Sequence, residues 1–141
     1  MITSEHIRQL RERVKLLAAC INVEQKREDL AKRQERTLEA NFWDDPKEAE
    51  KFLKDMSGVK FWVEGYDKVN SAVADLDVLL DFARESLRFM EDENLPNEVR
   101  ELDNAYLEAV KEVEALELRN MLGQEGDNLG AVMTINSGAG G

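Results

Sequence analysis

Apolar residues recur between positions 52 and 90 at alternating steps of four and three, and this spacing constrains the fold more than any other feature. Such a stripe occupies one side of an α-helix and packs against other helices, as in a coiled coil. A 3-3 step at Tyr66 breaks the alternation, and Gly58 and Gly65 each cost roughly 1 kcal/mol of helix propensity relative to Ala. Two collinear helices are possible, but we expect one long helix with a kink. The stripe consists of Phe52, Met56, Val59, Val63, Tyr66, Val69, Val73, Leu76, Leu80, Ala83, Leu87 and Met90.

A second stripe predicts an N-terminal helix that begins near Thr3 or Ser4, either of which can cap it. This helix is expected to end at the segment 41–46. Its second half is almost wholly charged, so we expect much of that half to lie in solvent. The stripe consists of Ile7, Leu10, Val14, Leu17 and Ile21, followed by a thin seam of Leu30, Ala31 and Leu38.

A third stripe predicts a helix from about Pro96 or Asn97 to Leu122, with Gly123 just past its end. The connections between the three helices are short, and short connections place successive helices antiparallel. The predicted fold is therefore all-α, an elongated antiparallel three-helix bundle or coiled coil. The third stripe consists of Val99, Leu102, Tyr106, Ala109, Val113 and Leu116.

The segment Phe42-Trp43-Asp44-Asp45-Pro46 predicts the turn of the first helix hairpin. Asp45 suits the N-cap of the second helix, and Pro46 suits its first position, where the missing N–H costs nothing. Phe42 and Trp43 precede the cap, and we expect them to fold back onto the helix as a hydrophobic staple. The alternative is that they are exposed and anchor a partner protein.

The C-terminal residues predict the beginning of a second domain. The stretch 131–135 alternates in part, as a β-strand does. One strand has unpaired edges and does not stand by itself. We therefore expect residues 1–126 to form a helical domain and residues 127–141 to open a truncated second domain. Glycines that permit a tight turn after the strand are Gly138, Gly140 and Gly141.

The net charge of −11 is unevenly distributed. Residues 1–40 hold nine Lys and Arg against seven Asp and Glu, whereas residues 41–141 hold ten against 23. An acidic body disfavours nucleic-acid binding by phosphate neutralisation and favours a basic protein partner. The basic half of the first helix is the candidate for a phosphate contact, but a solvated face with i,i+4 ion pairs explains the same charges and is the reading we favour. The candidate contacts are Lys26, Arg27, Lys32, Arg33 and Arg36.

No residue cluster predicts catalysis or cofactor binding. Cys20 and His6 are the only cysteine and histidine, which excludes an internal disulfide and a Cys/His metal site. We expect Cys20 to be a small buried side chain beside the first stripe. The serines are scattered without a supporting base. No apolar run approaches the roughly 20 residues needed to span a bilayer. The sequence therefore predicts a cytoplasmic protein with no catalytic residues, metal, cofactor, small-molecule ligand or membrane contact.

Several segments, taken in order, resemble the N-terminal region of bacterial class I peptide chain release factors. They are FWDDP at 42–46, the long helix after it, LELRNML at 116–122 and INSGAGG at 135–141. FWDDP and LELRNML are similar to the release factor 2 branch of that family. Each motif alone is unspecific, but their order and spacing extend the resemblance over essentially the whole chain.

The resemblance implies a role in translation termination. Full-length factors of this branch recognise the UAA and UGA stop codons and promote peptidyl-tRNA hydrolysis. Their helical domain contacts the ribosome near ribosomal protein L11 and the GTPase-associated region, and it influences the interplay with release factor 3. The branch's Ser-Pro-Phe codon-reading motif and its Gly-Gly-Gln motif are absent from this sequence, so no catalytic residue is assigned. The implied role of this chain is ribosome docking, and the basic half of the first helix is the candidate for a contact with rRNA.

A stand-alone coiled-coil scaffold or adaptor is the alternative function, because apolar stripes alone do not distinguish it from a docking domain. An exposed strip of helix would also favour a dimer of the isolated chain. The sequence alone does not decide between a docking domain and a scaffold, or between a monomer and a dimer.

Overall fold

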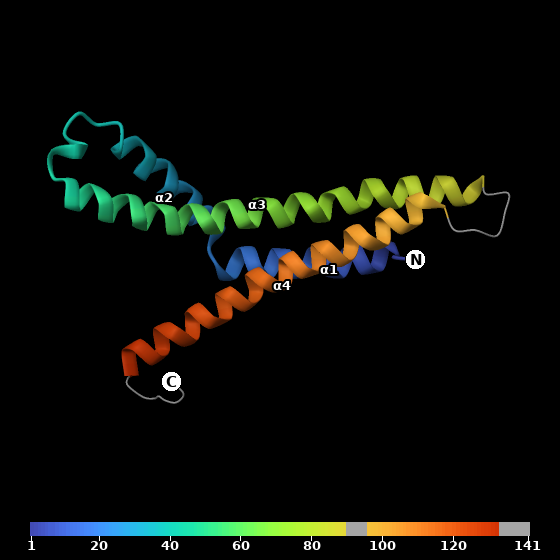
Figure 1. The fold of residues 1–141 in the computed structure, drawn as a ribbon. Helices are drawn as coiled ribbons and strands as arrows, with labels where there is room; N and C mark the ends of the chain where they lie inside the picture. The colour runs from blue at the N-terminus through green and yellow to red at the C-terminus, as the bar shows by residue number, and fades with distance from the viewer. Residues whose placement is uncertain (90–95, 133–141) are drawn as a thin grey trace.

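The computed structural model describes residues 1–89 and 96–132, with side chains up to residue 123. Within these ranges the regular structure is helical throughout (Figure 1), which confirms the predicted all-α class. The elements are α1 (Ser4–Cys20), α2 (Val23–Arg36), the 3₁₀ turn η1 (Phe42–Asp44), α3 (Pro46–Arg88) and α4 (Asn97–Val132).

Helix α3 is the central element of the fold and contacts every other element. Figure 1 shows α1 and the first part of α4 beside the C-terminal half of α3, and α2 beside its N-terminal half. Helices α1 and α2 run antiparallel to α3, and α4 runs back along it before its C-terminal end diverges (Figure 1). The predicted antiparallel arrangement is therefore confirmed, although its first arm consists of two helices.

The three predicted stripes form the core where α1, α3 and α4 meet. In the part of the chain that the structure describes, every buried side chain is apolar. The stripe of α3 is half-buried toward α2, at Phe52, Met56 and Val59, and buried further along except at Tyr66 and Leu87, which are half-buried. Its last predicted member, Met90, lies outside the described residues. The largest fully buried side chains are Ile7, Leu10, Leu76, Leu102, Val14, Val69, Val99 and Val113.

The predicted first helix is interrupted at Asn22, so the expectation of one helix up to residue 41 is wrong. Asn22 has φ 52° and ψ 55°, a left-handed conformation that Asn tolerates better than most residues. A continuous helix would place Glu24 and Glu28 on the line of the α1 stripe. The break instead brings Val23 into the core beside Ile21, and both are buried.

Helix α3 runs without interruption through Gly58 and Gly65, which confirms the prediction of a single long helix; the expected kink stays a prediction. Gly58 faces open space. A Cβ on Gly65 would lie 3.1 Å from Cδ2 of Leu116 on α4. The absence of a side chain at Gly65 thus lets α3 and α4 approach closely.

Helix α4 begins at Asn97, as predicted, but it continues past Gly123 to Val132. The expected end at Leu122 is therefore wrong, and residues 131 and 132 are helical rather than extended. A mid-helix glycine costs only about 1 kcal/mol, and no proline follows Gly123 to stop the helix. The rest of the predicted strand and the turn glycines Gly138, Gly140 and Gly141 lie outside the described residues. The domain boundary at 126/127 stays a prediction.

The single histidine, His6, takes part in the N-terminal cap of α1. The Thr3 backbone N–H donates to Nδ1 of His6 at 3.0 Å, and the His6 backbone N–H donates to Oγ1 of Thr3 at 3.4 Å. These reciprocal bonds form a capping box. The His6 ring also meets Tyr106 of α4 edge-on, with centroids 5.8 Å apart. His6 therefore has a structural role.

Candidate functional site

The predicted basic contacts and the predicted hairpin turn lie in one part of the molecule, which we call the tip (residues 23–58: α2, η1 and the first turns of α3). Phe42 in η1 is buried and packs edge-on against Phe52, with ring centroids 5.4 Å apart. Asp45 caps α3 by accepting the Glu48 backbone N–H at 3.3 Å, and Pro46 is the first helical residue. The predicted turn is therefore present, with Phe42 as its apolar anchor.

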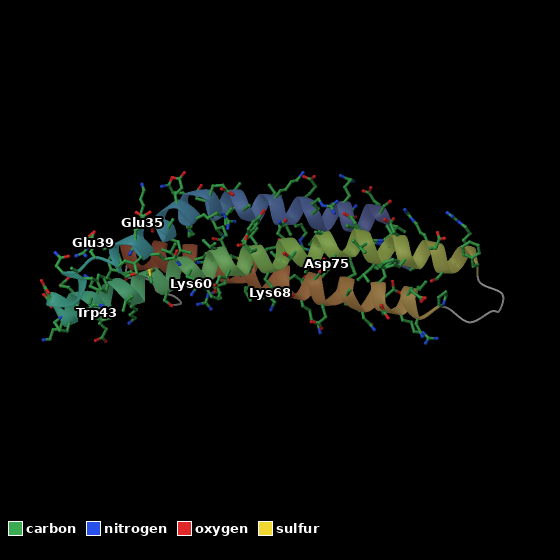
Figure 2. The ribbon with its side chains drawn as sticks, turned by 90° about the horizontal axis from the view of Figure 1, so that it is seen from above. Glu35, Glu39, Trp43, Lys60, Lys68 and Asp75 are labelled. Atoms are coloured by element: carbon green, nitrogen blue, oxygen red, sulfur yellow. The ribbon has the colours of Figure 1, made fainter. Side chains whose placement is uncertain are left out.

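Trp43 does not share this packing role. Its side chain is 60% exposed and touches Phe42 only edge-on, at 5.1 Å between ring centroids. Neighbouring residues of a 3₁₀ turn point about 120° apart, so burial of Phe42 directs Trp43 outward. Figure 2 shows Trp43 at the far end of the tip. Leu38, expected in the seam, is 85% exposed because α2 ends two residues before it. Two large apolar side chains thus face solvent here.

Arg27 pairs with a carboxylate of the neighbouring helix. Its guanidinium donates to both carboxylate oxygens of Asp67 on α3, at 2.9 and 3.1 Å. These hydrogen bonds lower the pKa of Asp67 and raise the pKa of Arg27. Because both side chains are about half exposed, at 41% and 51%, the pair orients α2 on α3 more than it stabilises the fold.

Three more of the predicted basic contacts have intramolecular partners. Lys26 donates to the Ile21 carbonyl at 2.5 Å, which satisfies an acceptor at the end of α1. Arg33 pairs with Asp29 at 2.9 Å and lies over the Phe52 ring. Arg36 pairs with Glu39 at 3.0 Å and lies over the Phe42 ring. Four of the five predicted basic contacts in α2 therefore have partners within the chain, whereas Lys32 is exposed and has no carboxylate within 4.0 Å in the described part of the chain. Contact with a ribosome by these residues stays a prediction.

An open groove of about 340 Å³ lies between the end of α2 and the start of α3. Phe42, Ala49 and Phe52 form its apolar base. Its rim carries charges of both signs, so it has no single electrostatic preference. The charged lining residues are Arg36, Glu48, Lys51 and Asp55.

Sequence reasoning missed a row of lysines on the exposed face of α3. Lys47, Lys51 and Lys54 line a shallow surface depression of about 350 Å³ together with Glu50. Their spacing of i, i+4 and i+7 is the signal that could have revealed the row, because such positions share one side of a helix.

Cys20 is exposed, so the prediction of a buried side chain is wrong. It lies one helical turn from Leu16 on the flank of the α1 stripe. Both residues border a shallow groove between α1 and α4, of about 230 Å³, which Met121 lines from the other side. Leu16 and Met121 are themselves 66% and 55% exposed.

Within 1–89 and 96–132, no three His, Cys, Asp or Glu side chains are grouped so that they would hold a metal ion. None of the helices in these ranges combines the length and apolar character required to cross a membrane.

Comparison with known proteins relates this helical architecture to a family. A family model described as PCRF domain matches residues 23–141. The chain belongs to the PCRF domain family. The match begins at Val23, the first residue of α2, and so includes the tip and all of α3 and α4.

Relatives of this PCRF domain chain are proteins named peptide chain release factor 2. The one from Arthrobacter sp. (strain FB24) is 34% identical over 139 residues, which is 98% of this chain and 35% of the relative. The one from Mycobacterium sp. (strain KMS) is 31% identical over 121 residues, or 86% of this chain and 32% of the relative. The one from Streptomyces avermitilis is 26% identical over 138 residues, or 98% and 36%. The chain thus spans about a third of the length of these relatives. No solved structure matches it significantly.

Proposed function

We propose that this chain is the N-terminal ribosome-docking part of peptide chain release factor 2 and acts in translation termination in the cytoplasm. The observation that carries the proposal is the PCRF match together with release factor 2 relatives that align with 86–98% of the chain. The same observation favours this function over a stand-alone coiled-coil scaffold. Because the chain covers about 35% of its relatives, codon recognition at UAA and UGA and peptidyl-tRNA hydrolysis are assigned to the remainder of a longer protein.

The docking contact is assigned to the tip. Trp43 and Leu38 are 60% and 85% exposed there, and exposed aromatic side chains are the usual anchors of protein interfaces. The partner surface we propose is the region of ribosomal protein L11 and the GTPase-associated centre, with release factor 3 as a second partner. Residues 41–141 carry ten Lys and Arg against 23 Asp and Glu, a balance that suits a basic ribosomal protein.

Ribosome binding tests this proposal. Purified chain is titrated against ribosomes and against ribosomes stripped of L11. We expect saturable binding that weakens at least tenfold without L11 and in Trp43→Ala. The control is Phe89→Ala, which removes an exposed aromatic side chain at the opposite end of α3 (70% exposed). Absence of binding to intact ribosomes would contradict the proposal.

A release assay tests whether hydrolysis belongs to the rest of the longer protein and docking to this chain. The chain is added to ribosomes that hold a peptidyl-tRNA at a UGA codon. We expect no peptide release, since catalysis is assigned to the rest of the longer protein. Codon-dependent release by residues 1–141 alone would refute this division.

A further inference from the structure

The lysines of this chain divide into two groups according to their partners. Five of the nine have an intramolecular partner: Lys26 binds a backbone carbonyl, and Lys15, Lys60, Lys68 and Lys111 each lie within 4.0 Å of a glutamate. The remaining four have no carboxylate within that distance in the part of the chain that the structure describes. All four lie in the tip: Lys32, Lys47, Lys51 and Lys54.

Three of these four lysines form a single row. Lys47, Lys51 and Lys54 are exposed and follow one another at i, i+4 and i+7 along the first two turns of α3. They line one shallow depression, in which Glu50 is the sole acidic lining residue. The acidic residues Glu48 and Asp55 line the groove toward α2, which Lys51 also borders. The row therefore presents three positive charges to solvent on the surface of an acidic chain.

The position of the row argues against a purely structural origin. Lys47 is the second residue of α3, and a cation in the first turn opposes the helix macrodipole. Asp45 and Glu48 already supply the acidic groups that the helix start favours. A solvated helix face would gain from i,i+4 pairs with glutamate, as Lys60 has with Glu64. Glu50 stands four residues before Lys54 and lines the same depression, yet in the described part of the chain no carboxylate lies within 4.0 Å of the three ammonium groups, so each is available to an external anion.

We infer that Lys47, Lys51 and Lys54 contact the phosphate backbone of RNA, and that this row, rather than the basic residues of α2, is the RNA-contacting part of the tip. The row spans about 10 Å at 1.5 Å per residue. A helical nucleic-acid strand presents roughly one phosphate per 3.4 Å of axis, so about three phosphates match the row. Lysine binds phosphate as a point charge without strict geometry, which suits a backbone contact. The inference rests on the proposed function at the ribosome.

Two triple variants test the inference. The first is Lys47→Gln, Lys51→Gln, Lys54→Gln; the matched control is Lys60→Gln, Lys68→Gln, Lys111→Gln, which removes the same charge from lysines that have glutamate partners. Binding to purified ribosomes is measured by sedimentation at several salt concentrations from 50 to 200 mM. We expect the first variant to raise Kd at least tenfold at 100 mM salt. We also expect it to lower the slope of log affinity against log salt by about 2–3. Circular dichroism melts establish that both variants fold.

Crosslinking shows whether the row contacts RNA or protein. A photoreactive amino acid replaces Ser57, which is exposed one turn beyond Lys54, and irradiated complexes are digested with ribonuclease or protease. An adduct whose shift disappears with ribonuclease supports the inference. A ribonuclease-resistant adduct to a ribosomal protein, or no adduct, overturns it.

The experiment distinguishes a failure of the proposed function from a failure of the inference about the lysine row. If the unmodified chain does not sediment with ribosomes, the proposed function fails and the inference with it. If the unmodified chain binds and the two triple variants weaken binding equally, the proposed function stands and the lysine row is not the contact.

Discussion

Gly65 of α3 faces Leu116 of α4 so closely that a Cβ on Gly65 would lie 3.1 Å from Cδ2 of the leucine. Leu116 is 7% exposed and belongs to the core, so its side chain has little free space into which to move. The two helices therefore cross at a point where one of them contributes only backbone. Gly58, two turns earlier on the same helix, has no atom within 4 Å of the equivalent position.

This difference predicts different outcomes for the same substitution at the two sites. Gly58→Ala should stabilise the chain by about 1 kcal/mol, because alanine has the higher helix propensity and the site is open. Gly65→Ala should lose most of that gain, and Gly65→Val should destabilise, because each added methyl displaces Leu116. Urea unfolding monitored by circular dichroism measures both. Equal stabilisation at the two sites would show that the crossing is looser than described.

Truncation of the core predicts a large loss of stability. Leu76 is completely buried between α1 and α4, so Leu76→Ala should cost on the order of 2–5 kcal/mol. Leu38→Ala is the control, because Leu38 is 85% exposed and its removal should change stability by less than about 0.5 kcal/mol. Thermal melts of both variants provide the measurement. A cost below about 1 kcal/mol for Leu76→Ala would mean that the α3 stripe is not core.

The left-handed backbone at Asn22 predicts a distinctive order of substitutions. With φ at 52°, Asn22→Gly should be neutral, whereas Asn22→Val should cost about 1–3 kcal/mol because a β-branched residue is strained there. The result is read from the denaturant midpoint. If valine were tolerated as well as glycine, α1 and α2 would form one continuous helix in solution.

The Arg27–Asp67 pair predicts a small dependence of stability on pH. The hydrogen bonds from Arg27 lower the pKa of Asp67 in the folded chain. Its contribution is therefore fully present above the carboxyl's ordinary value and is lost as pH falls below about 4. Because both side chains are largely exposed, the effect should stay below about 1 kcal/mol and shrink in high salt.

Replacement of a single carboxylate isolates that effect. Asp67→Asn should lose stability at pH 7 and should lose less at pH 2.5, because the wild-type carboxylate gains protons as pH falls through its lowered pKa. Asp75→Asn changes an exposed carboxylate further along α3 (Figure 2) and should be close to neutral at both pH values. A loss for Asp67→Asn that is the same at both pH values would argue for a packing role instead.

The apolar periodicities predicted the core closely, because burial follows directly from the spacing of side chains on a helix. The stripe from Ile7 to Ile21 is fully buried, and so are five of the six residues from Val99 to Leu116, Tyr106 being half-buried. Thr3, Asp45 and Pro46 were placed correctly because capping depends on local chemistry.

The errors arose where tertiary contacts decide between local alternatives. Nothing within residues 18–26 alone requires a break, and it is the burial of Val23 beside Ile21 that selects the left-handed Asn22. Gly123 permits a helix end without requiring one. Cys20 was expected inside because it lies beside the first apolar stripe, yet the flank of α1 on which it lies remains open toward α4.

The candidate site was harder to predict than the core. The basic sequence of α2 is like that of a helix that contacts RNA. Only the positions of its arginines against Asp67, Phe52 and Phe42 show that they connect α2 to α3 and η1. The lysines at 47, 51 and 54 have ordinary spacing, and only the lack of a carboxylate within 4.0 Å in the described part of the chain sets them apart.

Because α3 is one continuous helix, a rotation at one of its ends displaces the other end, as in a lever. At 1.5 Å per residue its 43 residues extend about 65 Å, with the tip at one end and the three-helix core at the other. A rotation of about 5° about the core end would displace Trp43 by roughly 5–6 Å over that length. A small change in the tilt of α3 where it packs against α1 and α4 would therefore move Trp43 by several ångströms.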